Sequence, residues 1–131
     1  MILVFTPIYA AILALFILLL AYQVVLMRRK KRIGIGDKGD QELAQKIRVH
    51  ANAIEYVPIA LLLIAFVEIN GGSAIWVNIS GALLVLSRVL HAYGLGKSIG
   101  ISKGRFYGTL ITWMVILSNA LTILINSLAN L

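Results

Sequence analysis

The segment from Phe5 to Met27 contains no charged residue, and a run of five basic residues, 28–32, follows it directly. At about 1.5 Å of helical rise per residue this segment reaches roughly 34 Å, enough to cross a bilayer core of about 30 Å. A cleaved signal peptide would have a shorter apolar run, with basic residues before it rather than after it. We therefore expect a retained transmembrane helix over about residues 5–27.

Three further long apolar segments follow, over about residues 41–68, 74–95 and 105–129. Asp40 is a candidate N-cap for the second, Pro58 is a candidate kink inside it, and the segment 70–73 (Asn-Gly-Gly-Ser) is typical of a tight turn. The chain is 60% hydrophobic and 13% charged, whereas soluble domains hold about 45–50% apolar and about 25% charged residues. The sequence predicts an all-α membrane protein, a single domain over residues 1–131 that folds as an up-down antiparallel bundle of four transmembrane helices.

The basic residues flank only the first and third connections between these segments. They are Arg28, Arg29, Lys30, Lys31, Arg32, Lys38, Lys46 and Arg48 around the first, and Arg88, Lys97, Lys103 and Arg105 around the third. Because positive loops stay on the cytoplasmic side, we expect both basic loops in the cytoplasm and both termini outside. The basic run also predicts contact with anionic membrane lipid. No nucleic-acid-binding motif accompanies the sequence pI of 10.1, so we expect no nucleic-acid partner.

Glycines recur every four residues at 96, 100, 104 and 108. This spacing is compatible with close packing of membrane helices. The stretch is also basic and interrupted, however, so we interpret these residues as loop and helix-end glycines.

The second segment carries a stripe of polar residues that an ordinary membrane span would lack. Gln41, Gln45, Arg48, Asn52 and Glu55 are spaced alternately by four and three residues, so they share one helix face. An ionisable group at the centre of a membrane helix costs roughly 2.5–3.5 kcal/mol, so this face should line the bundle interior or a wet cavity.

The third segment repeats this pattern at a similar depth with Arg88 and His91, three residues apart and therefore on one face. Arg105 enters at the same level. In the simplest alternative, Arg48 and Glu55 only neutralise one another. The convergence of these groups favours a polar site instead.

The residue types limit the chemistry of that site. The chain contains no cysteine, so any thiol must come from a ligand. There is no carboxylate pair for two-carboxylate acid–base catalysis. A metal site built from His50, His91 and Glu55 is disfavoured, because His50 lies about 200° around the helix from Arg48. The excess of arginine indicates an anionic ligand, since guanidinium groups bind carboxylates bidentately.

The segment Arg48–Pro58, RVHANAIEYVP, resembles the R-x-H-x-N-x-x-E-x-x-P signature of the MAPEG family, the membrane-associated proteins in eicosanoid and glutathione metabolism. The length, the four predicted spans and the pair of Arg88 and His91 agree with this resemblance. It covers essentially the whole chain.

The resemblance implies a homotrimer of four-helix bundles that binds glutathione, as a co-substrate, between neighbouring subunits. It assigns Arg48, Asn52, Glu55 and Tyr56 to glutathione binding and Arg105 to stabilisation of the glutathione thiolate. The third segment adds Arg88, His91 and Tyr93 as further candidates. His50 points away from the Arg48 stripe, so it would reach the ligand only from an adjacent subunit.

We therefore expect a glutathione transferase or peroxidase that acts on hydrophobic small molecules, in a bacterial inner membrane. The alternative is a non-catalytic lipid-binding or partner-presenting scaffold of the same family. A small four-helix drug transporter is disfavoured, because such proteins have an essential carboxylate in the first span and residues 1–27 contain none.

Overall fold

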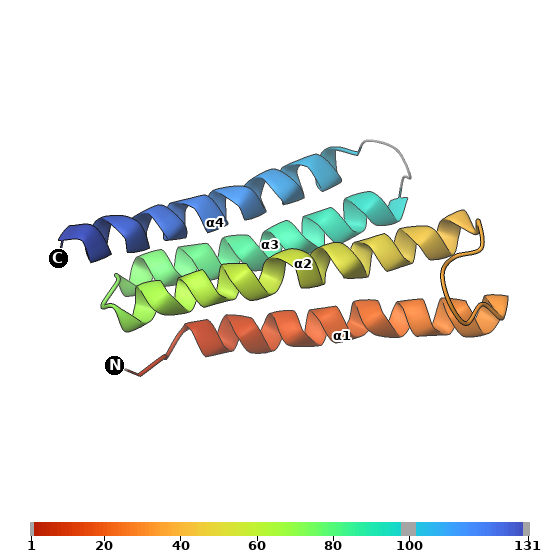
Figure 1. Cartoon of the computed structure of the whole chain (residues 1–131), viewed down its shortest axis with the longest axis horizontal. Helices are drawn as coiled ribbons and strands as arrows, with labels where there is room; N and C mark the ends of the chain where they lie inside the picture. Colours follow the sequence, from red (N-terminus) through yellow and green to blue (C-terminus); the bar gives the residue numbers. More distant parts are fainter. Residues whose placement is uncertain (1, 98–101, 130–131) are drawn as a thin grey trace.

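The computed structural model describes the backbone of residues 2–97 and 102–129, and the side chains of residues 2–94 and 102–129. Its four helices are α1 (Thr6–Lys31), α2 (Gln41–Ile69), α3 (Ala74–Lys97) and α4 (Lys103–Ala129). They run alternately up and down, and each is long and apolar enough to cross a membrane (Figure 1). The predicted all-α bundle of four transmembrane helices is confirmed.

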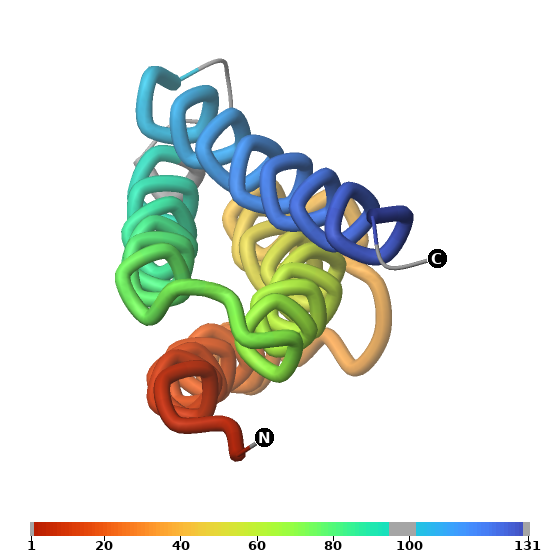
Figure 2. The backbone as a smooth tube through the Cα atoms, turned by 90° about the vertical axis from the view of Figure 1, so that its left-hand side faces the viewer, coloured from red at the N-terminus to blue at the C-terminus, as the bar shows by residue number. Residues whose placement is uncertain are grey.

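The N-terminus and the C-terminus lie at the same end of the bundle (Figure 1). The opposite end, where α1 ends, α2 begins, α3 ends and α4 begins, carries the basic residues and is called the basic end below. In the end-on view α2 lies among the other three helices, and it contacts each of them (Figure 2). Within the described residues α1 and α4 make no contact, and α3 and α4 form the most extensive pair.

Helix α1 continues through the basic run to Lys31 instead of ending near Met27, and it closes on Arg32 in the left-handed conformation (φ 55°). Lysine and arginine are good helix formers, and cations in a last turn interact favourably with the helix dipole. Helix α2 begins after Asp40, whose carboxylate accepts a hydrogen bond from the Leu43 backbone N–H at 2.9 Å. This confirms the predicted N-cap. Lys31 lies 2.6 Å from the same carboxylate and holds the pKa of Asp40 below its ordinary value.

The tight turn between α2 and α3 is also confirmed. Gly71 adopts a φ of 81°, which a glycine accepts without strain. The Gly72 N–H donates to the Val67 carbonyl at 2.9 Å, and the Gly71 N–H donates to the Glu68 carbonyl at 3.1 Å. These bonds satisfy carbonyl groups at the end of α2 and reverse the chain into α3.

The main apolar core extends from the middle of the bundle toward the α2–α3 turn. Its buried members are Leu13, Val57, Ala60, Ile64, Val67, Val77, Leu84 and Val115. Many large apolar side chains instead point outward, including Leu15 (68% exposed) and Leu117 (61% exposed). In a soluble protein such a surface would aggregate, but on a membrane-spanning helix it faces lipid tails.

Helices α3 and α4 meet along a seam of small and polar residues. On α3 the buried positions Val77, Ser80, Leu84, Ser87, His91 and Gly94 recur at alternating intervals of three and four residues. On α4 the buried positions Gly108, Thr112, Val115 and Asn119 do the same. Such a repeat keeps one face of each helix against its partner.

The glycines of α4 have a different role from the one expected. A side-chain carbon on Gly108 would lie 2.6 Å from the Ser87 carbonyl oxygen, and one on Gly104 would lie 2.9 Å from the Leu90 carbonyl oxygen. Both residues belong to α4 and let its backbone approach α3 closely. Gly104, the second residue of α4, is a helix-end glycine as expected, whereas Gly108 lies inside the helix and corrects that interpretation. Gly96 lies in the last turn of α3, and Gly100 is outside the described residues.

At the end opposite the basic end, a buried carboxylate joins α2 to the start of α1. Glu68 accepts hydrogen bonds from the backbone N–H groups of Val4, Phe5 and Thr6 at 2.7, 2.8 and 2.8 Å. It also accepts one from the Thr6 hydroxyl. The first N–H groups of a helix have no partner within it, so Glu68 supplies the cap that the sequence before α1 lacks.

Candidate functional site

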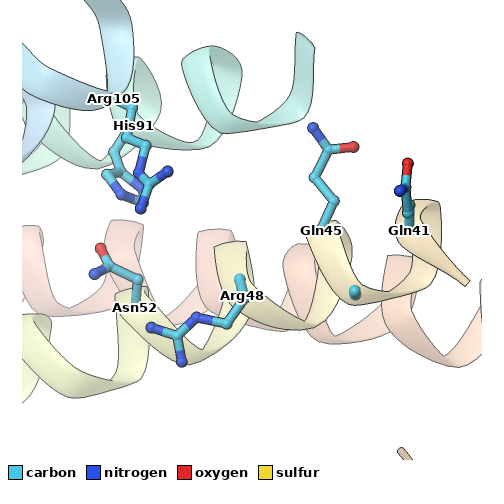
Figure 3. A pocket seen from close by; sticks show the side chains of 7 residues that line it. Gln41, Gln45, Arg48, Asn52, His91 and Arg105 are labelled. Carbon is cyan, nitrogen blue, oxygen red and sulfur yellow. The ribbon is translucent and has the colours of Figure 1, made fainter. Parts of the chain in front are cut away.

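A polar cavity of about 220 Å³ opens between α2, α3 and α4 at the basic end. It is lined by Gln41, Ala44, Gln45, Arg48 and Asn52 from α2, His91 from α3 and Arg105 from α4. Figure 3 shows His91 and Arg105 across this pocket from Arg48 and Asn52. Four members of the predicted stripe on α2 therefore line a partly open cavity between α2, α3 and α4. The cavity is called the polar pocket below.

Glu55, the fifth member of the stripe, lies beside the polar pocket and not in its lining. Its carboxylate is 3.7 Å from the Arg48 guanidinium, with both side chains more than half exposed. An exposed pair of this kind contributes only about 0–1 kcal/mol. Arg48 thus has the carboxylate partner considered in the sequence, yet it also remains part of the pocket wall.

Arg88 lies behind the pocket wall and is only 2% exposed. Its guanidinium donates to Asn52 Oδ1 at 2.8 Å, to the Gly108 carbonyl oxygen at 3.0 Å and to the Thr112 hydroxyl. Its Cζ lies 5.7 Å from the ring centre of Tyr56, a distance typical of a cation–π contact. Of the predicted ligand-binding residues, Arg88 and Tyr56 thus contact one another and do not line the polar pocket.

Arg105 lines two cavities. Besides the polar pocket it borders an apolar groove of about 370 Å³ on the outer face of α4, lined also by Ser102, Phe106, Thr109, Leu110 and Trp113. Arg105 is in the first turn of α4, where the backbone N–H groups add partial positive charge. A polar pocket and an apolar groove therefore meet at one guanidinium.

His50 and Tyr93 are not brought into the polar pocket. His50 is half-buried on α2 and is absent from the pocket lining. Tyr93 is 62% exposed and borders a separate groove between α1, α2 and α3. That groove also includes Lys46, which donates to Gln23 Oε1 at 2.7 Å. Tyr93 follows His91 by two residues, so the two side chains leave α3 in nearly opposite directions.

The side chains that support the pocket from behind were not predicted from the sequence. Ser87 and Thr112 are fully buried, and their hydroxyl oxygens lie 2.9 Å apart. Thr112 and Gly108 both accept hydrogen bonds from Arg88. The buried positions of α3 and α4 are spaced alternately by three and four residues, and this spacing was a signal that could have identified the seam between the two helices.

The charge balance around the polar pocket is positive. Three arginines lie in or behind its wall, Arg48, Arg105 and the buried Arg88, and the one carboxylate described beside it, that of Glu55, pairs with Arg48. No group of three His, Cys, Asp or Glu side chains with the geometry of a metal site occurs in the described part of the chain. An arrangement of this kind is suited to an anion that carries carboxylate groups.

The fold and the pocket define a class: an integral membrane protein of four helices with an arginine-lined polar pocket at one end of the bundle. The sequence model of the MAPEG family matches residues 6–125, and the chain belongs to this family. The resemblance read from residues 48–58 is thereby confirmed.

The chain is also similar to the inner membrane protein YecN of Escherichia coli strain K12. The two are 37% identical over 112 residues, which cover 86% of this chain and 84% of YecN. YecN of Escherichia coli O6:H1 strain CFT073 matches to the same extent. Together with the four apolar helices, this similarity supports an integral inner-membrane location.

Proposed function

We propose that this protein binds glutathione in the polar pocket and uses the glutathione thiol to attack hydrophobic electrophiles or peroxides dissolved in the membrane. Membership of the MAPEG family supports glutathione as the ligand class. The observation that carries the proposal is the position of Arg105, which borders both the polar pocket and the apolar groove. A thiolate beside Arg105 would meet a second substrate lying in that groove.

The ligand chemistry suits the pocket. Glutathione carries two carboxylates, one ammonium group and a thiol, so it is a net anion with one cationic end. Arg48 offers forked donors for a carboxylate, and the Glu55 carboxylate, 3.7 Å from the Arg48 guanidinium, is available to the ammonium group. The absence of cysteine from the chain is consistent with a thiol supplied by the co-substrate.

The size of the pocket supports a site shared between subunits. The polar pocket measures about 220 Å³ in one chain, whereas small-molecule sites span roughly 300–1,000 Å³. A neighbouring copy of the chain, in the homotrimer that the family resemblance implies, would complete its open side. His50, which does not line the polar pocket of its own chain, is a candidate contribution from that neighbour.

Arg105 would act by favouring the thiolate over the thiol. A thiol with a pKa of about 8.5 is only a few per cent ionised at about pH 7, and lowering that pKa by ~2 units requires about 2.7 kcal/mol. A guanidinium in a poorly hydrated site, reinforced by the start of α4, can supply this stabilisation. In the transfer reaction the thiolate sulfur forms a bond to the electrophilic carbon, and the displaced group leaves with the electron pair.

The test is a titration of the purified protein with glutathione that follows the heat of binding and the ultraviolet absorbance of the thiolate together. We expect saturable binding with thiolate formation in the wild type. Arg48→Ala should abolish binding, and Arg105→Ala should leave binding without ionisation. Arg29→Ala is the matched control, because Arg29 is exposed and lies outside the polar pocket.

The same titration, followed by a turnover assay and a lipid-binding assay, separates the enzyme from the non-catalytic alternative. Binding with thiolate formation, followed by turnover of a hydrophobic electrophile, supports the enzyme. Binding of a lipid in the apolar groove with no thiolate at any glutathione concentration favours a lipid-binding or partner-presenting scaffold. No heat at millimolar glutathione contradicts the proposal as a whole.

A further inference from the structure

Arg88 is a buried cation without an acidic partner. The chain has five acidic residues, and all lie in the described part. Asp40 and Glu42 pair with Lys31, Glu55 pairs with Arg48, Glu68 caps α1, and Asp37 accepts the Gly39 N–H. Among the described residues the Arg88 guanidinium is therefore held by neutral acceptors only. A buried charge in this state is costly unless its hydrogen bonds are well made.

One acceptor, Ser87 Oγ at 3.5 Å from Arg88 Nε, lies on the same helix, and three others come from two different helices. Arg88 belongs to α3, Asn52 to α2, and Gly108 and Thr112 to α4. A planar guanidinium with five donors can hold three acceptors at set angles, which a lysine ammonium on a flexible stem does less well. Arg88 thus joins three helices at the level of the polar pocket.

The bond to Asn52 fixes the orientation of its carboxamide. A carboxamide has one oxygen, which accepts, and one NH2 group, which donates. Arg88 offers only donors, so the Asn52 oxygen must face Arg88. The NH2 group is then the part of Asn52 left for the pocket, whose wall includes this residue.

We propose that Arg88 is a positioning residue that acts through Asn52, holding its NH2 group toward an acceptor oxygen of the bound ligand. This inference rests on the proposed function, in which that oxygen is a carboxylate or peptide carbonyl of glutathione. Arg88 itself does not touch the ligand. Its role is to select which end of the Asn52 side chain the ligand meets.

Asn52→Asp separates this role from a purely structural one. The new carboxylate gives Arg88 a buried ion-pair partner, so the midpoint of thermal unfolding should stay level or rise. The NH2 donor is replaced by an acceptor oxygen, so glutathione binding should weaken by at least about tenfold. A variant that keeps both stability and affinity overturns the proposal.

A double-mutant cycle tests the coupling directly. Asn52→Ala and Arg88→Met should each weaken glutathione binding by about tenfold or more, the cost of one hydrogen bond to a charged acceptor. The double variant should bind no more weakly than Arg88→Met alone, because each change disables the same donor. Losses that multiply would mean that the two residues act independently, and would overturn the proposal. If Arg88→Met does not fold, Arg88→Lys takes its place in the cycle.

Ser80→Ala is the matched control. It removes a buried hydrogen bond of the same α3–α4 seam, from Asn119 Nδ2 to Ser80 Oγ at 3.1 Å, away from the polar pocket. It should lower thermal stability without changing glutathione affinity.

Failure of the proposed function would be recognisable separately. If the wild type binds no glutathione, the midpoint of thermal unfolding without ligand is measured instead for the wild type, the two single variants and the double variant. Midpoint shifts that are not additive then support the fixed Arg88–Asn52 geometry, and shifts that add overturn it.

Discussion

At the scale of single residues, the arginines of the site have three different environments. Arg48 is exposed and paired loosely with Glu55, Arg105 borders two cavities, and Arg88 is buried among neutral acceptors. The same type of side chain therefore lines the open pocket at Arg48, separates two cavities at Arg105 and supports the pocket wall at Arg88. Substituting them one at a time should give three distinct outcomes. Loss of Arg48 should abolish glutathione binding, loss of Arg105 should prevent ionisation of the bound thiol, and loss of Arg88 should weaken binding because the Asn52 carboxamide is no longer oriented.

Glu55 offers a test of how the ligand is oriented. If its carboxylate receives the ligand ammonium group, wild type should bind N-acetylglutathione about tenfold more weakly than glutathione, because acetylation removes that charge. Glu55→Gln should bind both compounds equally, at the weaker level. Its folding free energy should change by less than about 1 kcal/mol, since the pair with Arg48 is exposed. Isothermal titration of both proteins with both compounds checks this, and continued discrimination by Glu55→Gln would contradict the assignment.

The residues that could be predicted from the sequence are those whose signal is local. A polar stripe in a membrane helix stands out because each member is costly in lipid, and its period states which side chains share a face. The Arg88 contacts could not be predicted, because the spacing along each helix indicates which face packs inward but not which side chains on different helices meet. The Glu68 cap joins positions more than sixty residues apart for the same reason. Tyr93 was named as a candidate together with His91, although a separation of two residues turns the two side chains to nearly opposite faces of the helix.

At the scale of helices, the approach of α4 to α3 depends on glycine. Gly108→Ala would place a carbon 2.6 Å from the Ser87 carbonyl oxygen and 2.7 Å from the His91 backbone nitrogen, so two backbones would have to separate. We expect a loss of about 1–3 kcal/mol in stability, typical of overpacking. Thermal unfolding in detergent measures it. Gly34→Ala, where nothing lies within 4 Å, is the control and should be neutral.

Because Gly108 also supplies the carbonyl oxygen that accepts from Arg88, this substitution should reach the site as well. We expect weaker glutathione binding in Gly108→Ala and unchanged binding in Gly34→Ala. Equal affinity in both would mean that the seam and the polar pocket are independent.

Glu68 controls the other end of α1. Glu68→Ala leaves three backbone N–H groups and a hydroxyl without their acceptor, and we expect a loss of at least about 1.5–3 kcal/mol, the worth of one hydrogen bond to a charged group. Hydrogen exchange should speed up at residues 4–6, with Glu68→Gln intermediate. Glu42→Ala, which removes an exposed contact to Lys31 at 3.1 Å, should change stability by less than about 1 kcal/mol. Exchange at residues 4–6 that is equal in wild type and Glu68→Ala would rule out the cap.

At the scale of the whole molecule, the two ends of the bundle have separate tasks. The basic end carries the polar pocket, the basic run after α1 and the start of α4. The opposite end carries the Glu68 cap and the α2–α3 turn, which are both structural. A site at the basic end would face whichever compartment that end occupies, so the orientation in the membrane decides where the ligand comes from.

The orientation can be measured directly because the chain contains no cysteine. Ile35, 84% exposed, lies between α1 and α2 at the basic end, and exposed Ser73 lies in the turn at the opposite end. The positive-inside rule predicts that a membrane-impermeant maleimide labels Ser73→Cys in intact spheroplasts and labels Ile35→Cys only after the membrane is opened. Replacing residues 28–32 by glutamine should weaken this asymmetry, since those charges set it. A reversed labelling pattern would put the polar pocket on the outer side of the membrane, where cytoplasmic glutathione could not reach it, and would remove the physical basis for the proposed reaction.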